Sequence, residues 1–331
     1  MTNEPAVLLG LEDVRNLHEE EIERLLVSGL DDGRLADRAA RYHLATGGKR
    51  LRAYLPVWLA TNLGAGVQDA LAFGAGLELL HNATLVHDDL QDGDTHRRGV
   101  PAVWTRWGAP QAINVGNALF FHGLSALMRS LLVAELLPAV DDAMLRVIGG
   151  QALEFQLQRP VGDPDRVDPS LASWGEMAGG KTGALFGACL RAGAVAARAP
   201  GALVEAAAGL GERLGLLFQV QDDLLDLVGD KGREQRATDI AEGKISYPVA
   251  WSIAFAAPAA VERLMAIVTA PRAETTSAMI AEAVSLLHDV GAVSATVEWL
   301  RTEERLATED PVARLLPGLV DRLLAPVRHV M

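Results

Sequence analysis

The chain of 331 residues is half hydrophobic, has few aromatic residues and carries a formal net charge of -13. Its length and apolar content suffice for a sizeable core. Its acidic balance argues against nucleic acids or anionic membranes as partners, because both are bound through basic surfaces. Cys189 is the single cysteine and lies in an apolar run, so we interpret it as a packing residue in a protein of the reducing cytoplasm.

The N-terminal segment contains the first two predicted helices. Apolar residues recur at helical spacing from Leu11 to Leu26, and a second helix is expected at about 34–44. The first residues include no basic segment, and charged or polar residues interrupt every long apolar run. We therefore expect neither a signal peptide nor a membrane span.

Two glycines and a basic cluster follow the second predicted helix. Gly47 and Gly48 let the backbone approach another group closely. The basic residues after them lie on the first turn of the next helix, whose N-terminus favours an anion. They are Lys49, Arg50 and Arg52. We interpret this segment as a phosphate pocket, although by itself it would also fit a glycine-containing turn with a solvated basic face.

A long helix, expected at about 67–92, ends in an acidic cluster of sequence D-D-x-x-D. The cluster consists of Asp88, Asp89 and Asp92. The first and last aspartates project from the same face one turn apart, where like charges destabilise a helix. Carboxylates together with substrate phosphates are the usual ligands of Mg²⁺, so the cluster predicts a cation site.

Three residues before this cluster belong to the same prediction. His81 lies two turns before Asp88 on the same face. A single histidine on an apolar face is often a core residue, but this alignment favours a functional role. Ala83 and Thr84 are small, so a tail attached to a group held by the aspartates would point past them.

The loop at 93–101 carries Arg97 and Arg98, which are either counter-ions of the aspartates or planar forks for a diphosphate. Further helices are expected at about 110–132, 138–158 and 170–177. The glycine-flanked pair Lys181 and Thr182 follows them. The pair is not part of a Walker motif, because the glycine spacing differs and no strand precedes it.

A second long helix, expected at about 202–228, carries Gln219 and a second D-D-x-x-D cluster. This cluster consists of Asp222, Asp223 and Asp226. After a polar loop, Lys244 is expected to open a further helix in which Pro248 is a candidate kink. The rest is amphipathic helix, and no convincing strand or linker occurs, so we predict a single all-α domain over residues 1–331.

These motifs, in this order, resemble the trans-isoprenyl diphosphate synthases, or polyprenyl synthetases. The resemblance runs from Gly47 to Pro248. Each motif alone is weakly specific, whereas the ordered set is highly specific. The matching segments are T-G-G-K-R-L-R at 46–52, His81 with L-V-H-D-D-L-Q-D at 85–92, R-R-G at 97–99, K-T at 181–182, F-Q-V-Q-D-D-L-L-D at 218–226 and G-K at 243–244.

The resemblance implies an isoprenoid synthase fold, a bundle of about ten or more helices around a central cavity, usually as a homodimer. It implies a prenyltransferase of isoprenoid biosynthesis that joins an allylic diphosphate to isopentenyl diphosphate with Mg²⁺, or with Mn²⁺ in its place. By the same resemblance, Asp88, Asp92 and Asp222 would hold the metal, supported by Asp89, Asp223 and Asp226; Arg97, Lys181, Thr182, Gln219 and Lys244 would hold the allylic diphosphate; and Lys49, Arg52, His81 and Arg98 would hold isopentenyl diphosphate.

Two positions depart from the family pattern. Asn117 stands where the family usually has aspartate, which is expected to alter a supporting hydrogen bond rather than the metal ligands. Glu234 stands where a lysine is common, and Lys231 or Arg233 is a candidate substitute.

Product length is predicted from the residues before the first cluster, where bulky side chains shorten the product in this family. Ala83 and Thr84 are small, so the expected product is geranylgeranyl diphosphate, with a longer polyprenyl chain as the alternative. Phe120 or Phe121 would form the floor of the tail cavity.

The two alternative functions are a class I terpene cyclase and a non-catalytic subunit of a heteromeric synthase. A cyclase needs one acidic cluster and no second diphosphate site, and a non-catalytic subunit typically lacks aspartates of the clusters. Both clusters and the segment at 46–52 are present, which favours chain elongation.

Overall fold

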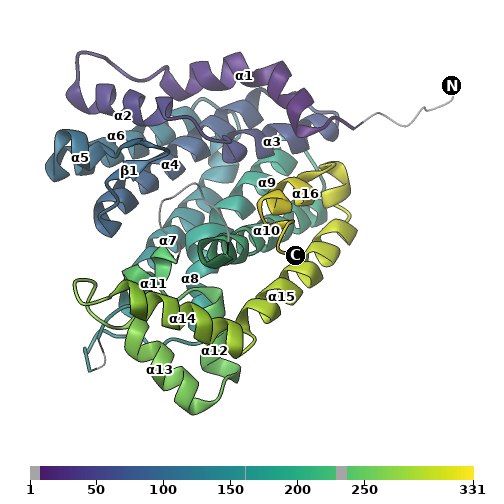
Figure 1. Cartoon of the computed structure of the whole chain (residues 1–331). Helices are drawn as coiled ribbons and strands as arrows, with labels where there is room; N and C mark the ends of the chain where they lie inside the picture. The colour runs from purple at the N-terminus through teal and green to yellow at the C-terminus, as the bar shows by residue number, and fades with distance from the viewer. Residues whose placement is uncertain (1–7, 161, 229–236) are drawn as a thin grey trace. The chain divides into compact units, whose positions relative to one another are not determined.

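The computed structural model describes residues 8–160, 162–228 and 237–331. Helices make up most of it (Figure 1). Contacts divide the chain into two compact units. The first comprises Met1–Val140, Ala188–Ala208 and Leu315–Pro317, and the second Asp141–Gly187, Gly209–Arg314 and Gly318–Met331. The single domain expected from the sequence stays a prediction.

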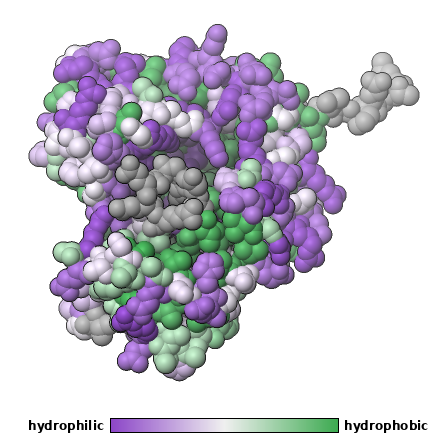
Figure 2. All heavy atoms as spheres, viewed as in Figure 1, coloured by the Kyte–Doolittle hydropathy of each residue, from purple (hydrophilic) through white to green (hydrophobic). Residues whose placement is uncertain are grey.

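The first unit is built around a long buried helix. Its complete helices are α1 (Leu11–Val27), α2 (Leu35–Ala45), α3 (Leu51–Asn62), α4 (Gln68–Asp92), α5 (Val103–Trp107) and α6 (Ala109–Leu127). Helix α4 packs against α3 and α6, and most of its side chains before the acidic cluster are buried. Glycines allow the close approach: a Cβ at Gly76 would lie 3.0 Å from the carbonyl oxygen of Gly123 on α6. Polar side chains cover the outer face over α1 and α2 (Figure 2).

A short hairpin interrupts the loop that follows α4. Strands β1 (His96–Arg97) and β2 (Val100–Pro101) pair antiparallel. Arg98 and Gly99, at the turn, both have positive φ angles of 52° and 80°, as tight hairpin turns require. The sequence predicted only a loop here, because two-residue strands are too short to show an alternating pattern.

The second unit is also helical. Helices α7 (Val133–Leu157), α9 (Ala184–Ala196) and α10 (Gly201–Val228) contribute residues to both units. The others are α8 (Leu171–Ala178), α11 (Thr238–Glu242), α12 (Tyr247–Phe255), α13 (Pro258–Val268), α14 (Ser277–Asp289), α15 (Ala292–Glu309), α16 (Leu319–Leu324) and the 3₁₀ turns Ala313–Leu315 and Ala325–Val327, with a π-helical turn, η1 (Gly179–Gly183), between α8 and α9.

Three predicted boundaries are wrong. Helix α6 ends at Leu127 rather than near residue 132, because Asp69 of α4 accepts hydrogen bonds from the Ser130 hydroxyl (2.5 Å) and the Leu131 amide (2.8 Å), which hold a turn there. The next helix begins at residue 133, so Pro138 lies inside it. Helix α12 begins after Lys244, and Pro248 occupies one of its first two positions, where a missing N–H costs little and no kink is needed.

Within the described ranges no single helix is both long enough and apolar enough to cross a membrane. The pair α14 and α15, bent by 59°, meets the length and composition together.

Candidate active site

In the first unit the glycine turn and Arg98 lie together, although about fifty residues separate them in sequence. Gly47 and Gly48 have φ angles of 85° and 131°. The Arg98 guanidinium donates to the Gly47 carbonyl and, at 3.3 Å, to the Thr46 hydroxyl. A Cβ at Gly48 would lie only 2.6–2.8 Å from atoms of the same guanidinium. Glycine at 48 is therefore needed both for the backbone angle and for the approach of Arg98.

Arg52 and His81 form the adjoining pair. The Arg52 Nη1 lies 3.0 Å from the His81 Nε2. Burial, followed by the charge of Arg52, holds the pKa of His81 well below its ordinary value, so the imidazole is neutral. Because a guanidinium only donates, Nε2 accepts and the ring proton is on Nδ1. Lys49, the remaining predicted residue of this site, has an exposed side chain, and its carbonyl accepts a 2.6 Å bond from Arg15.

The first acidic cluster contains two kinds of aspartate. Asp88 and Asp92 are partly exposed, whereas Asp89 is 1% exposed. Asp89 accepts from the Arg97 Nε at 2.7 Å and contacts its Nη2 at 2.5 Å. Burial raises the pKa of the Asp89 carboxyl, and the bonds from Arg97 act against that rise. The cluster thus presents two carboxylates and uses the third to hold Arg97.

The residues predicted to gauge the product lie on α4 and α6. Ala83 is fully buried, and Thr84 is half-buried with its hydroxyl bonded to the His81 carbonyl at 2.8 Å. Phe120 lies 5.9 Å from the ring of His87 on α4, whereas Phe121 is 71% exposed. Of the two phenylalanines, Phe120 is therefore the one directed towards α4.

In the second unit a chain of polar contacts links the predicted residues of η1 and α10. The Thr182 hydroxyl donates to the Gln219 Oε1 at 2.9 Å, and the Gln219 amide donates to Asp223 at 2.9 Å. The other oxygen of Asp223 accepts from the backbone N–H of Tyr247 at 2.7 Å. Lys181 contacts the Glu154 carboxylate of α7 at 2.5 Å.

The second acidic cluster is also divided by burial. Asp222 is partly exposed, whereas Asp223 and Asp226 are 4% and 3% exposed. Asp226 accepts from the Thr238 hydroxyl (2.7 Å) and the Asp239 amide (3.0 Å), which fixes the start of α11. Of the three aspartates in this cluster, only Asp222 is partly exposed, as Asp88 is in the first cluster.

Lys244 and the positions that depart from the family pattern complete the predicted set. Lys244 pairs with Glu242 at 2.8 Å. The side chain of Asn117 is exposed on α6. Glu234 and its candidate substitutes Lys231 and Arg233 lie outside the described residues.

Two buried glutamates were not among the predicted site residues. Glu154 contacts Lys181, and Glu78 lies on α4 one turn before His81. Each is a carboxylate in a mainly apolar stretch of its helix. Such a residue is seldom fully buried without a partner, and this was the signal available in the sequence.

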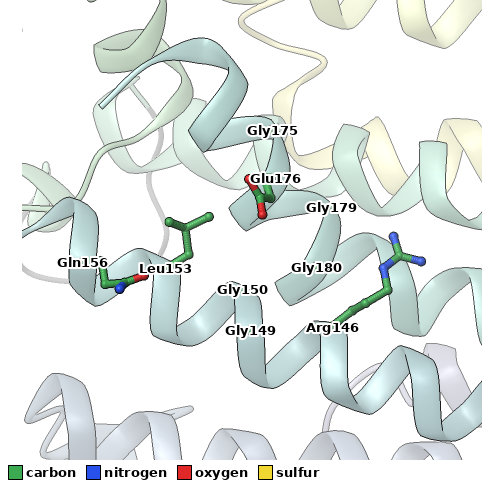
Figure 3. Close-up of a pocket in the computed structure, with 9 residues that line it drawn as sticks. All are labelled: Arg146, Gly149, Gly150, Leu153, Gln156, Gly175, Glu176, Gly179 and Gly180. Atoms are coloured by element: carbon green, nitrogen blue, oxygen red, sulfur yellow. The ribbon is translucent and has the colours of Figure 1, made fainter. Parts of the chain in front are cut away.

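No group of three or more histidine, cysteine, aspartate or glutamate side chains in the described part of the chain forms a ready metal site. A separate pocket of about 450 Å³ lies between α7 and the α8–η1 segment (Figure 3). Glycines 149, 150, 175, 179 and 180 line much of it, and Glu176 extends between the two segments. None of the predicted site residues is among its lining residues.

A model of the polyprenyl synthetase family matches residues 34–287. The chain is 34% identical over 260 residues to a short chain isoprenyl diphosphate synthase of Methanothermobacter thermautotrophicus, covering 77% of each. It is 37% identical over 248 residues to a geranylgeranyl diphosphate synthase of Mycobacterium tuberculosis (73% of this chain, 68% of the relative). It is 33% identical over 290 residues to a (2E,6E)-farnesyl diphosphate synthase of Mycobacterium bovis (86% and 78%).

Solved structures give the same likeness. A geranylgeranyl pyrophosphate synthase matches with a TM-score of 0.84 and 25% identity over 96% of this chain and 98% of the other. A polyprenyl synthase from Caulobacter crescentus, complexed with calcium and isoprenyl diphosphate, matches with a TM-score of 0.79 and 28% identity over 96% of each. The all-α fold predicted from the sequence is confirmed.

Proposed function

Because the chain belongs to the polyprenyl synthetase family, we propose that it condenses an allylic diphosphate with isopentenyl diphosphate to give a longer trans-prenyl diphosphate. The observation that carries this proposal is the basic site of the first unit. Arg98 contacts the glycine turn, and Arg52 contacts His81. His81 lies on α4, the helix that also carries Asp88 and Asp92. A diphosphate site separate from the acidic cluster is what distinguishes elongation from cyclisation.

The partly exposed aspartates of the two clusters fit a hard divalent cation. Mg²⁺ is usually bound through one or two carboxylates together with substrate phosphates. Of the six cluster aspartates, Asp88, Asp92 and Asp222 are partly exposed, so they would hold Mg²⁺, and Mn²⁺ would suit the same oxygen ligands. When bound, the ion supplies positive charge to the departing diphosphate.

The remaining polar residues have binding roles. Lys49, Arg52, His81 and Arg98 hold the diphosphate of isopentenyl diphosphate. The neutral His81 offers its Nδ1 proton without adding a charge. The residues for the allylic diphosphate are Arg97, Lys181, Thr182, Gln219 and Lys244. The two lysines among them form ion pairs, Lys181 with Glu154 and Lys244 with Glu242.

The reaction needs no protein nucleophile. The C–O bond at the allylic carbon breaks and leaves an allylic cation beside the diphosphate. The isopentenyl double bond attacks that carbon to form the new C–C bond, and a proton is then lost to the released diphosphate. The apolar face of α4 before the acidic cluster, including Ala83, excludes water that would otherwise trap the cation.

Geranylgeranyl diphosphate or a longer chain is proposed as the product. The support is the small size of Ala83 and Thr84, with Phe120 on α6 as the floor of the tail site. The relatives named for a geranylgeranyl and for a farnesyl product have comparable identities to the chain, 37% and 33%. The proposed product length therefore rests on the side chains before the first acidic cluster. Ala83→Phe should shorten the product.

A homodimer is proposed on the basis of an apolar face of α6. Exposed large apolar residues recur there at helical spacing, and Asn117 lies on the same face. They are Ile113, Phe121 and Leu124 of α6 and Met128, the residue that follows it. So large an apolar stripe usually marks a contact between proteins. Phe121→Glu should give monomers in sedimentation analysis, and an unchanged mass would contradict the proposed interface.

The direct test incubates the protein with Mg²⁺, labelled isopentenyl diphosphate and farnesyl diphosphate, and sizes the dephosphorylated products. Elongated chains that disappear on addition of EDTA support the proposal. No elongation would reject it, and a cyclic hydrocarbon would identify a terpene cyclase instead.

A further inference from the structure

A buried polar cluster lies directly behind the glycine turn. Arg50, Glu78, Asn82 and His43 are 8%, 4%, 1% and 2% exposed. They come from the start of α3, from α4 and from the end of α2, so they join the three helices that surround the turn. Burial of polar groups destabilises a fold unless they are paired, so a cluster of four indicates a specific role.

Arg50 is the centre of the cluster. It adopts a left-handed backbone with φ of 48° at the position immediately before α3. Its Nη2 donates to the Leu44 carbonyl at 2.5 Å, and its Nη1 lies 3.6 Å from the Glu78 carboxylate. The Nη1 has no hydrogen-bond partner in the described ranges. Arg50 is therefore held by one hydrogen bond to the Leu44 carbonyl and, on its Nη1 side, by the charge of Glu78.

Glu78 connects this arginine to the proposed isopentenyl site. It lies one turn before His81 on α4, and the Asn82 amide donates to its Oε1 at 3.1 Å. Its charge also reaches further arginines: burial lowers the pKa of both Arg52 and Arg98, and the charge of Glu78 acts against that lowering in each. The ion pair of this buried carboxylate is with Arg50, whereas Arg52 and Arg98 experience its charge only at longer range.

We propose that Glu78 is a positioning residue for isopentenyl diphosphate: its carboxylate holds Arg50, and through Arg50 the turn and the first residues of α3, in the arrangement that places Arg52 at His81 and Arg98 at Gly48. The identity of the ligand rests on the proposed function. The positioning of the turn by a buried carboxylate rests on the contacts alone.

The chain provides a matched control for this proposal. Glu23 of α1 also lies near Arg50, with its Oε1 3.5 Å from Nε, but its side chain is 49% exposed. Water screens such a pair, so its loss has little effect, whereas loss of the buried partner leaves a charge uncompensated. Glu78→Gln should weaken binding about tenfold or more, and Glu23→Gln less than about twofold.

The experiment has two arms. In steady-state assays, Glu78→Gln should raise KM for isopentenyl diphosphate about tenfold while KM for farnesyl diphosphate stays unchanged. In calorimetry with EDTA, which removes metal-dependent binding, titrated inorganic diphosphate should bind the wild type, bind Glu23→Gln nearly as well, and bind Glu78→Gln more weakly. The double variant Arg50→Gln/Glu78→Gln should bind no more weakly than Arg50→Gln, because Glu78 acts through Arg50.

Several results would overturn the positioning role. These are equal diphosphate affinities for Glu78→Gln and Glu23→Gln, parallel changes in both KM values, additive losses in the double variant, or a wild type that does not bind diphosphate in EDTA. If Glu78→Gln proves too unstable to purify, the double variant, which buries no unpaired charge, carries the comparison with Arg50→Gln. A wild type that binds diphosphate in a Glu78-dependent way yet elongates nothing would reject the proposed function and leave the positioning role standing.

Discussion

Replacing Asp88 and Asp89 separately by asparagine should distinguish a residue that acts on the substrate from a residue that holds the fold. The two aspartates are adjacent on α4, and the substitution is the same, so the variants differ chiefly in burial and contacts. Asp88 presents a partly exposed carboxylate, whereas Asp89 is 1% exposed and paired with Arg97.

The magnitude for Asp89 follows from its contacts. Removing one partner of a buried ion pair costs about 3–5 kcal/mol, and the Arg97 side chain, still 22% exposed, places this case near the lower value. A chain of this length unfolds with an entropy of roughly 0.7 kcal/mol per degree. A loss of about 3 kcal/mol should therefore lower Tm by about 4 °C.

Asp88→Asn should leave Tm within about 1 °C of the wild type, because substitutions of exposed groups change stability by about 0.5 kcal/mol or less. Its kcat should fall about a hundredfold or more, since a ligand of the proposed metal is lost. The measurements are calorimetric unfolding without substrate and the rate of incorporation of labelled isopentenyl diphosphate. Equal losses of Tm in the two variants, or near-normal turnover in Asp88→Asn, would refute the distinction.

Three further predictions concern the glycine turn, the product length and the pH dependence of stability. Gly48→Ala should raise KM for isopentenyl diphosphate about tenfold because its Cβ would displace Arg98. Gly47→Ala also strains a backbone with positive φ but has open space at its Cβ, so it should raise this KM less; equal effects in kinetic assays would contradict the contact. Thr84→Phe should shorten the product, and an unchanged length distribution on chromatography would remove the proposed gauge. Burial and nearby arginines lower the pKa of His43 in the folded chain to about 3. Between about pH 6.5 and pH 3, this side chain is therefore protonated in the unfolded chain and neutral in the folded chain. His43 alone should then lower stability by about 1.4 kcal/mol per pH unit on acidification. In urea unfolding, His43→Gln should remove that part of the slope and leave the part due to His81, whose pKa burial also lowers.

The long helices were predictable because their apolar periodicity extends over many turns. The expected helices at 11–26 and 67–92 correspond to α1 (Leu11–Val27) and α4 (Gln68–Asp92). The end of α6 was not predictable, since Asp69, far away in sequence, holds the turn after it. The hairpin at Arg97 and the π turn at η1 also depend on local geometry that periodicity does not show.

The candidate site was predictable as a set of residues and not as an arrangement. The spacing D-D-x-x-D identified both clusters. The spacing does not predict that Asp89 accepts a hydrogen bond from Arg97 or that Asp226 accepts one from Thr238. Which aspartate of a cluster is buried depends on how α4 and α10 pack. Glu78 was visible as a charged residue in an apolar run, but its partner Arg50 was identifiable only once α3 and α4 were placed together.

The π-helical turn at Gly179–Gly183 has a consequence for how such a site can arise and be lost. A π turn accommodates one residue more than the α-helix around it, and such turns occur often at functional sites. Deleting a single glycine from η1 would allow α8 and α9 to continue as one α-helix, with every side chain on one side of the deletion rotated by about 100°. Such a rotation would separate the Lys181 side chain from Glu154 or the Thr182 hydroxyl from Gln219. A change of one codon can therefore create or remove the present arrangement of these two side chains.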